Sequence, residues 1–283
     1  MRAMLTTTLT FAAVALGAFL LLCGYLYVRQ DRLIFYPRPN DPELREHWRT
    51  KRIEIASGDT VLEGWWAECG SAPTSDTVIL YFGGNAEDVL GTARVASRFA
   101  CKRMLVVNYR GYGETKGRPG QDALYQDALA IYDYAIDAGG AEPEHIVVMG
   151  RSLGSGLATL LAARRTVRGA ILITPYDSIL AVASRHYAWF PVERLLRHPF
   201  HSAQLARDAK APGLFLLAAR DNVIPPSHGE ALAKAWAGRK SVHVLAGVGH
   251  NDIEMDPGYY DLINRFLQAI APEARPDVQH AAL

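Results

Sequence analysis

The sequence lacks any concentration of charge. Its 30 Lys and Arg residues nearly balance its 29 Asp and Glu residues, the formal net charge is +1, and no run of Lys or Arg occurs. Proteins that bind nucleic acid usually carry a basic patch that contacts the phosphates. Internal repeats and low-complexity segments are missing as well, so the sequence predicts neither a nucleic-acid partner nor a repeat architecture.

Cysteine is scarce. Cys23, Cys69 and Cys101 form no Cys-x-x-Cys pair and show no zinc-like spacing, which excludes a metal site built on cysteine. Cys69 and Cys101 lie outside the apolar N-terminal run and could pair if the domain faces an oxidising compartment. The favoured interpretation is that both are free thiols packed as small apolar side chains. The sequence predicts no cofactor and no bound metal.

Residues 9–28 contain no charged side chain and lie between Arg2 and Arg29. The run is long enough to cross the hydrocarbon core of a bilayer, which needs about 20 residues. The alternative is a cleaved signal peptide, whose apolar region has about 7 to 15 residues and ends at a cleavage site of small residues. Bulky residues close the run and no such site follows, so we predict an uncleaved single-pass membrane anchor over residues 1–30.

Four aromatic residues near this run are candidates for the bilayer interface: Tyr25, Tyr27, Tyr36 and Trp48. Positive charges after the run slightly outnumber those before it. That difference leans towards a cytoplasmic globular domain, but it is too small to decide the side of the membrane.

Beyond the anchor we predict a linker over residues 31–50, one globular domain over residues 51–271 and a loose tail over residues 272–283. The 283-residue length and 49% hydrophobic content suit one large α/β domain, because single domains of that class commonly run to about 250 residues. The tail holds Pro272, Pro276 and small or polar residues, a composition typical of poorly ordered termini. The oligomeric state is not predicted.

Short apolar runs alternate with helical patterns through this domain. An antiparallel pair is predicted at residues 51–55 and 62–66, followed by strands at 77–82, 104–109, 145–149, 169–174, 213–217 and 241–245. Helices are predicted at about 87–99, at 122–138 and directly after Ser152. Strands that alternate with helices at this spacing predict a mostly parallel sheet with helices on both faces.

Residues 177–209 break this alternation. They mix aromatic residues with arginines and histidines, which predicts a small lid insertion that lies over the site and offers an aromatic surface to an apolar substrate. His186, His198 and His201 lack a regular ligand spacing, so we predict solvated surface residues and not a metal site.

The segment Gly150-Arg151-Ser152-Leu153-Gly154 follows a β-branched apolar run and precedes a helical pattern. A serine between strand and helix occupies a strained turn that presents its hydroxyl, and side chains on either flanking glycine would collide with neighbouring backbone. The segment therefore predicts that Ser152 is a nucleophile.

Asp221 and His250 lie in loops that follow the predicted strands 213–217 and 241–245. Open α/β sheets gather their functional groups at the carboxyl ends of the strands. Together with Ser152 these residues appear in the order Ser, Asp, His, which matches the order of an α/β-hydrolase triad. Asp177 is a rival acid, but it follows the preceding strand and is assigned to the lid.

A glycine-rich loop, Gly83-Gly84-Asn85, connects the strand at 77–82 to a helix. Its backbone N–H groups could stabilise an oxyanion, although a plain strand-to-helix turn is the alternative. A phosphate-binding loop is disfavoured because the Gly-Lys-Ser/Thr ending is missing.

Several segments together resemble one family: Tyr81-Phe82-Gly83-Gly84-Asn85-Ala86-Glu87, Asn108-Tyr109-Arg110-Gly111-Tyr112-Gly113, Gly150-Arg151-Ser152-Leu153-Gly154, Thr174-Pro175-Tyr176-Asp177-Ser178, Asp221 with Pro225, and Gly249-His250-Asn251-Asp252. They are similar to the membrane-anchored serine hydrolases of the abhydrolase-domain type, within the α/β-hydrolase superfamily. The resemblance covers nearly all of residues 51–271 and implies an α/β-hydrolase fold.

The resemblance also implies roles for individual residues. Ser152 attacks a carbonyl, His250 transfers the proton, and Asp221 orients the imidazole. The backbone N–H groups of Leu153 and Asn85 hold the oxyanion, in a loop shaped by Gly83 and Gly84. The sequence departs from the family at Gly83, where histidine is common.

From these features we expect a membrane-tethered serine hydrolase that cleaves carboxylic ester or thioester bonds in lipid-like or acylated substrates. A serine peptidase is a second enzymatic possibility, because the same triad cleaves amides. A tethered binding module that keeps the fold without catalysis is an alternative from a different class.

Overall fold

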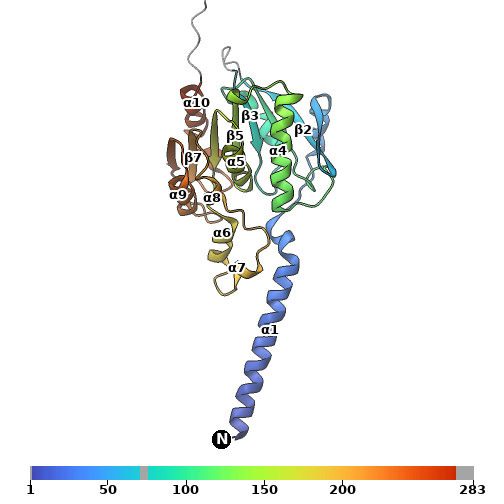
Figure 1. Ribbon diagram of the computed structural model, residues 1–283, viewed down its shortest axis with the longest axis vertical. Coiled ribbons are helices and arrows are strands. Elements are labelled where there is room, and N and C mark those ends of the chain that lie inside the picture. The colour runs from blue at the N-terminus through green and yellow to red at the C-terminus, as the bar shows by residue number, and fades with distance from the viewer. Residues whose placement is uncertain (1, 71–75, 272–283) are drawn as a thin grey trace, which may run out of the picture.

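The computed structural model describes residues 2–70 and 76–271, so the tail predicted at residues 272–283 lies outside the described residues. Its centre is one sheet of eight strands in the order β1-β2-β4-β3-β5-β6-β7-β8 (Figure 1). The strands are β1 (Arg52–Ser57), β2 (Thr60–Glu68), β3 (Val78–Phe82), β4 (Arg103–Val107), β5 (Ile146–Arg151), β6 (Gly169–Ile173), β7 (Gly213–Ala218) and β8 (Lys240–Leu245).

The sheet is mostly parallel, as predicted. β1 and β2 form an antiparallel hairpin and β2 runs antiparallel to β4, whereas β3 to β8 all pair in parallel. Every residue of β3, β6 and β7 is buried, because helices cover both faces of the sheet. The parallel strands therefore end along one edge, where their following loops meet.

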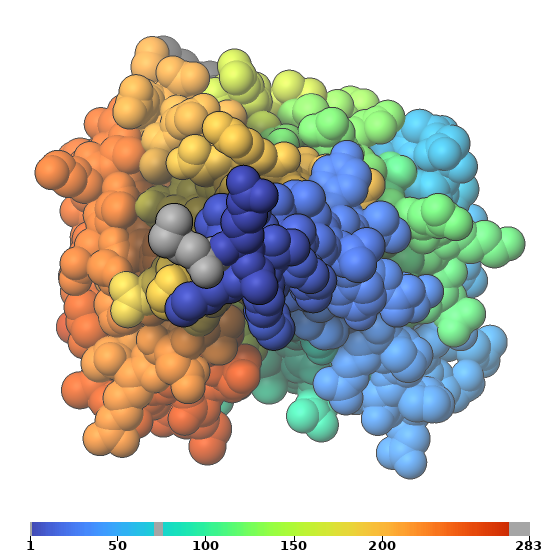
Figure 2. All heavy atoms as spheres, turned by 90° about the horizontal axis from the view of Figure 1, so that it is seen from below, coloured from blue at the N-terminus to red at the C-terminus, as the bar shows by residue number. Residues whose placement is uncertain are grey.

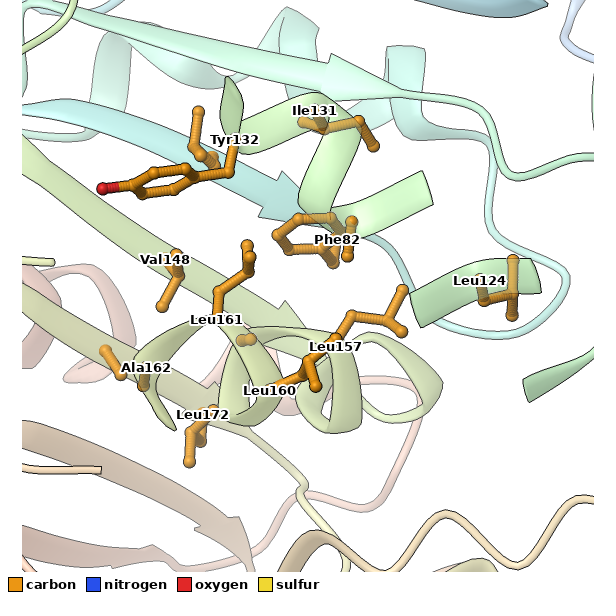
Figure 3. Close-up of a cluster of buried hydrophobic side chains, with 14 of the residues drawn as sticks. Phe82, Leu124, Ile131, Tyr132, Val148, Leu157, Leu160, Leu161, Ala162 and Leu172 are labelled. Carbon is orange, nitrogen blue, oxygen red and sulfur yellow. The ribbon is translucent and has the colours of Figure 1, made fainter. Parts of the chain in front are cut away.

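Two layers of helices cover the sheet. One layer contains α4 (Gln121–Asp137), α5 (Leu153–Arg164), α8 (Ser202–Leu205) and α9 (Pro226–Ala235), and the other contains α3 (Val89–Arg94) and α10 (Tyr259–Ala269). Figure 3 shows the first layer packing, with Leu157 and Leu161 of α5 close to Val148 and Phe82 of the strands. Each leucine buried in this way contributes about 1.5–3 kcal/mol to folding.

The helix predicted at residues 87–99 is divided. Asp88 caps α3 by accepting a hydrogen bond from the backbone N–H of Leu90, and a 3₁₀ turn at Ala96–Arg98 follows after Arg94. Other short elements are α2 (Pro42–His47) and 3₁₀ turns at Arg49–Lys51, Pro143–His145 and Ile253–Met255. The prediction of one helix over residues 87–99 was wrong because Asp88 is the N-cap and the chain tightens after Arg94, where the backbone N–H of Val95 donates to the carbonyl of Thr92 (3.1 Å).

Cys69 and Cys101 form a disulfide, so the favoured prediction of two free thiols was wrong. Antiparallel pairing of β2 with β4 places Glu68 opposite Arg103, and the backbone N–H of Cys69 donates to the carbonyl of Lys102. The two cysteines follow from this register, with their Cα atoms 5.3 Å apart. A sequence separation of 32 residues gives no indication of that pairing.

The N-terminal apolar run lies in one helix, α1 (Arg2–Ile34), which is long and apolar enough to cross a membrane. It continues to Ile34, into the segment predicted to be a linker. Trp48 was proposed for the bilayer interface, but its side chain is 7% exposed and packs in the core with α3, so that prediction was wrong. Figure 1 shows α1 projecting from the body on the side where α6 (Ile179–His186) and α7 (Val192–Leu195) also lie.

Candidate active site

Ser152 occupies a tight turn between β5 and α5. Its backbone angles are φ 49° and ψ −115°, in the positive-φ region that side chains rarely adopt. The turn is held by a hydrogen bond from the Ser152 N–H to the carbonyl of Ile173 (2.9 Å). The carbonyl of Ser152 accepts from both the N–H and the hydroxyl of Ser155. These contacts stabilise a conformation that is costly by itself.

The two glycines beside this turn are required by close backbone contacts. A Cβ on Gly150 would lie 2.3 Å from the carbonyl oxygen of Gly154, and a Cβ on Gly154 would lie 2.1 Å from that of Phe82. Both contacts are well inside van der Waals distance, so a side chain at either position would force the turn apart. This is the collision that the sequence predicts.

Three side chains from different loops meet at the carboxyl edge of the sheet. Nε2 of His250 lies 2.9 Å from Oγ of Ser152, and Nδ1 of His250 lies 2.7 Å from Oδ2 of Asp221. All three residues are buried. The other Asp221 oxygen accepts backbone N–H bonds from Val223 (2.9 Å) and Ile224 (2.7 Å), which fixes the carboxylate's orientation.

Asp177, the rival acid, lies in a different contact. Its Oδ1 lies 2.8 Å from Nδ1 of His228 and accepts the backbone N–H of Ser178. Ser178 in turn caps α6 through a hydrogen bond from the N–H of Ala181. Asp177 therefore helps to position the first helix of the predicted lid. His228 is a partner that the sequence did not reveal, because it lies on α9, 51 residues further along the chain.

The loop at Gly83-Gly84-Asn85 is held by two side chains that the sequence reasoning missed. Oε2 of Glu87 accepts the backbone N–H of Gly84 (2.7 Å), and its Oε1 accepts the hydroxyls of Tyr81 and Thr92. On the other side, the hydroxyl of Tyr109 donates to the carbonyl of Gly83 (2.6 Å). Burial raises the pKa of the Tyr81 and Tyr109 phenols well above the usual range, so both remain protonated donors.

Asn85 connects this loop to the end of α1. Its side-chain amide donates to the carbonyl of Ile34 (2.7 Å), and its Oδ1 accepts from the N–H of Tyr36 and the hydroxyl of Tyr112. Within residues 2–70 and 76–271, the backbone N–H groups of Asn85 and Leu153 have no hydrogen-bond acceptor. Both groups therefore remain free to bind an oxyanion.

A cavity of about 650 Å³ includes Ser152 and His250 in its lining. Most of the remaining wall is apolar and comes from α1, α6, α7 and the segment between those last two helices, with the charged side chains of Glu87 and Arg151 beside Ser152. The wall includes Leu26, Ile179, Val182, Phe190, Leu195 and Ile224. The predicted lid segment thus encloses the space in front of the serine.

The histidines of that segment are not all solvated. His198 is only partly exposed, and its Nε2 lies 3.1 Å from Asp31 while its ring meets Phe35 edge-on. His186 is exposed, with its Nε2 3.0 Å from the carbonyl of Val223. The prediction of solvated surface histidines was therefore wrong for His198, which Asp31 and Phe35 cover, and His201 is half-buried as well.

No family model matches the chain. It is 32% identical over 258 residues to an uncharacterized protein of Mycobacterium tuberculosis, covering 87% of this chain and 90% of that protein. It is 28% identical over 250 residues to the α/β hydrolase domain-containing protein WAV2 of Arabidopsis thaliana, covering 80% of each. Among solved structures, the Pyrococcus furiosus esterase Pf2001 superposes with a TM-score of 0.65 at 16% identity, covering 83% of this chain and 97% of that one.

Proposed function

Because the chain belongs to the α/β-hydrolase superfamily, among its α/β-hydrolase domain-containing proteins, we propose that it is a serine hydrolase with Ser152, His250 and Asp221 as its triad. The observation that carries the proposal is the continuous contact from Ser152 Oγ through His250 to Asp221, at 2.9 and 2.7 Å. That geometry lets the imidazole accept the hydroxyl proton as the oxygen attacks a carbonyl carbon.

The reaction has two halves. Ser152 Oγ bonds to the carbonyl carbon, its proton passes to Nε2 of His250, and His250 then protonates the leaving group as the scissile bond breaks. Water hydrolyses the resulting acyl-enzyme with His250 again taking and returning the proton. Asp221 keeps the imidazole in the tautomer that accepts at Nε2 and stabilises its positive charge.

The negative charge on the carbonyl oxygen is stabilised by the backbone N–H groups of Leu153 and Asn85. Leu153 begins α5, a 12-residue helix whose N-terminal dipole also favours negative charge. Asn85 is kept in place by its side-chain bonds and by Glu87. Loss of one donor in such a site commonly lowers kcat by about 10² to 10³.

The cavity favours an acyl ester or thioester over a polar substrate. Its walls are mostly aliphatic and aromatic, so an apolar acyl chain would be stabilised by about 0.8 kcal/mol for each methylene group it buries. The N-terminal half of α1 extends away from this cavity, and we propose that it anchors the protein in the membrane as a single-pass helix. Lipid-like esters and acylated molecules are the matching substrates.

Turnover and labelling of the full chain test this function together. Wild-type protein should hydrolyse p-nitrophenyl acetate and react with a fluorophosphonate probe, and Ser152→Ala should lose both. Ser97→Ala is the matched control, because Ser97 is exposed on the 3₁₀ turn Ala96–Arg98. Turnover and labelling that persist in Ser152→Ala would reject Ser152 as the nucleophile, and a wild-type protein inactive in both assays would favour a binding module.

A further inference from the structure

The second half of α1 is packed against the globular domain, whereas its first half is not. Cys23, Leu26, Gln30 and Ile34 are buried or half-buried and recur at helical spacing, so they share one face. Leu26, Gln30, Leu33 and Ile34 line the cavity that contains Ser152. The second half of α1 therefore forms one wall of the cavity, and its first half extends beyond the globular domain.

Polar contacts fix this wall in position. Gln30 is 6% exposed, and its side-chain amide donates to the carbonyl of Leu195 (2.9 Å) while accepting the backbone N–H of Arg197 (2.7 Å). Asp31 forms an ion pair with Arg197 (2.6 Å). Because Asn85 binds the end of the same helix, α1 is joined to both the lid segment and the proposed oxyanion loop.

The lid segment extends along α1 and contacts the apolar run of that helix. Phe190 stacks on Phe19 with ring centroids 5.7 Å apart, and Trp189 beside it is 91% exposed. Figure 2, viewed from below, shows the yellow lid segment beside the dark blue anchor. The contact lies well before Arg29, the first charged residue after the run.

Helix geometry gives the depth at which the contact between Phe19 and Phe190 lies in a bilayer that α1 spans. Residues 3–28 carry no charge and span about 39 Å at 1.5 Å per residue, compared with about 30 Å of hydrocarbon. Whether the hydrocarbon begins at residue 28 or at residue 22, Phe19 lies about 4 to 14 Å inside it. Phe190 then lies at the level of the acyl chains, and so does this end of the cavity.

We propose that the acyl chain of a membrane-resident lipid ester enters the cavity sideways from the leaflet, beside α1 at the level of Phe190, and that Leu26 of the anchor limits the chain length that fits. The proposal rests on the proposed function, because the chamber leads to Ser152. The acyl chain would pass from lipid to an apolar wall without crossing water. Exposure to water would lower the equilibrium constant for entry by about fourfold for each methylene group.

Chain-length preference of the full protein in phosphatidylcholine nanodiscs tests this proposal. Leu26→Trp should lower kcat/KM for p-nitrophenyl palmitate relative to the acetate by about fifteenfold, the effect of displacing two buried methylene groups. Leu26→Ala should shift the preference towards longer chains. Leu21→Trp is the matched control, because Leu21 is 77% exposed on the same helix outside the cavity. Equal profiles for the Leu26 and Leu21 variants would overturn the proposal.

A second readout does not depend on hydrolysis. A monoacylglycerol with a diazirine at the end of its acyl chain, dissolved in the nanodisc, should label Ile179 and Val182, which line the cavity from α6. Leu26→Trp should reduce that labelling and Leu21→Trp should not. Absence of labelling in the wild type would overturn the proposal. Labelling without any ester turnover would instead support the route and reject the proposed function.

Discussion

Asp221 uses its two carboxylate oxygens for separate tasks. One contacts His250, and the other accepts two backbone N–H groups, so the side chain cannot rotate without breaking those bonds. The sequence predicted this residue from its place after a buried strand. It could not predict the pairing of Asp177 with His228, because that contact depends on how α9 packs against β7.

Asp221→Asn tests the assignment of the acid. An amide in this position can donate to Nδ1 and stabilise the wrong imidazole tautomer, so we expect kcat for p-nitrophenyl acetate to fall by about 10⁴-fold. Asp177→Asn is the control and should keep most of the activity. The reverse ranking of the two variants would identify Asp177 as the acid of the triad.

Glu87 holds the loop that contains Gly83, through its hydrogen bond from the backbone N–H of Gly84. Replacing its carboxylate in Glu87→Gln weakens a charge-assisted bond to the Gly84 N–H, and we expect kcat to fall about tenfold with little change in KM, because the loss acts on the oxyanion loop. Glu46→Gln, whose carboxylate is exposed and faces Arg49, should behave as wild type. An unchanged kcat in Glu87→Gln would show that the loop does not need this contact.

Local sequence patterns predicted the strands but not the contacts between segments that are distant in the sequence. Buried runs such as residues 78–82 identify strands because both faces of a central parallel strand are apolar. The last residue of α1, Ile34, is hydrogen-bonded to Asn85, 51 residues away, and the junction with the lid includes the bond from Gln30 to Leu195. No periodicity within either segment encodes such contacts.

The segment between α6 and α7 should lie among the acyl chains if α1 spans the bilayer. Trp189 is almost fully exposed, so its fluorescence in nanodiscs should be quenched by lipids brominated on the acyl chains. Comparison with Trp189→Phe isolates its signal from the other four tryptophans. Quenching by an aqueous quencher such as acrylamide, with none by the brominated lipids, would place this segment in water.

For the whole molecule, the disulfide bears on which side of the membrane holds the domain. A Cys69–Cys101 bond that forms in the cell requires an oxidising compartment, in contrast to the slight lean of the charges around α1. We expect thiol alkylation of the denatured protein to modify only Cys23 before reduction, and all three cysteines after reduction. Modification of all three cysteines without reduction would support a reducing, cytoplasmic location.

The identity of the residue that reacts with a fluorophosphonate is the most direct test of the central claim, that Ser152 is the nucleophile of a serine hydrolase. The full chain in nanodiscs should gain one probe mass, carried by the peptide that contains Ser152. Asp221→Asn should form the same adduct more slowly. An adduct on another residue, or no adduct under conditions that preserve the fold, would contradict the account.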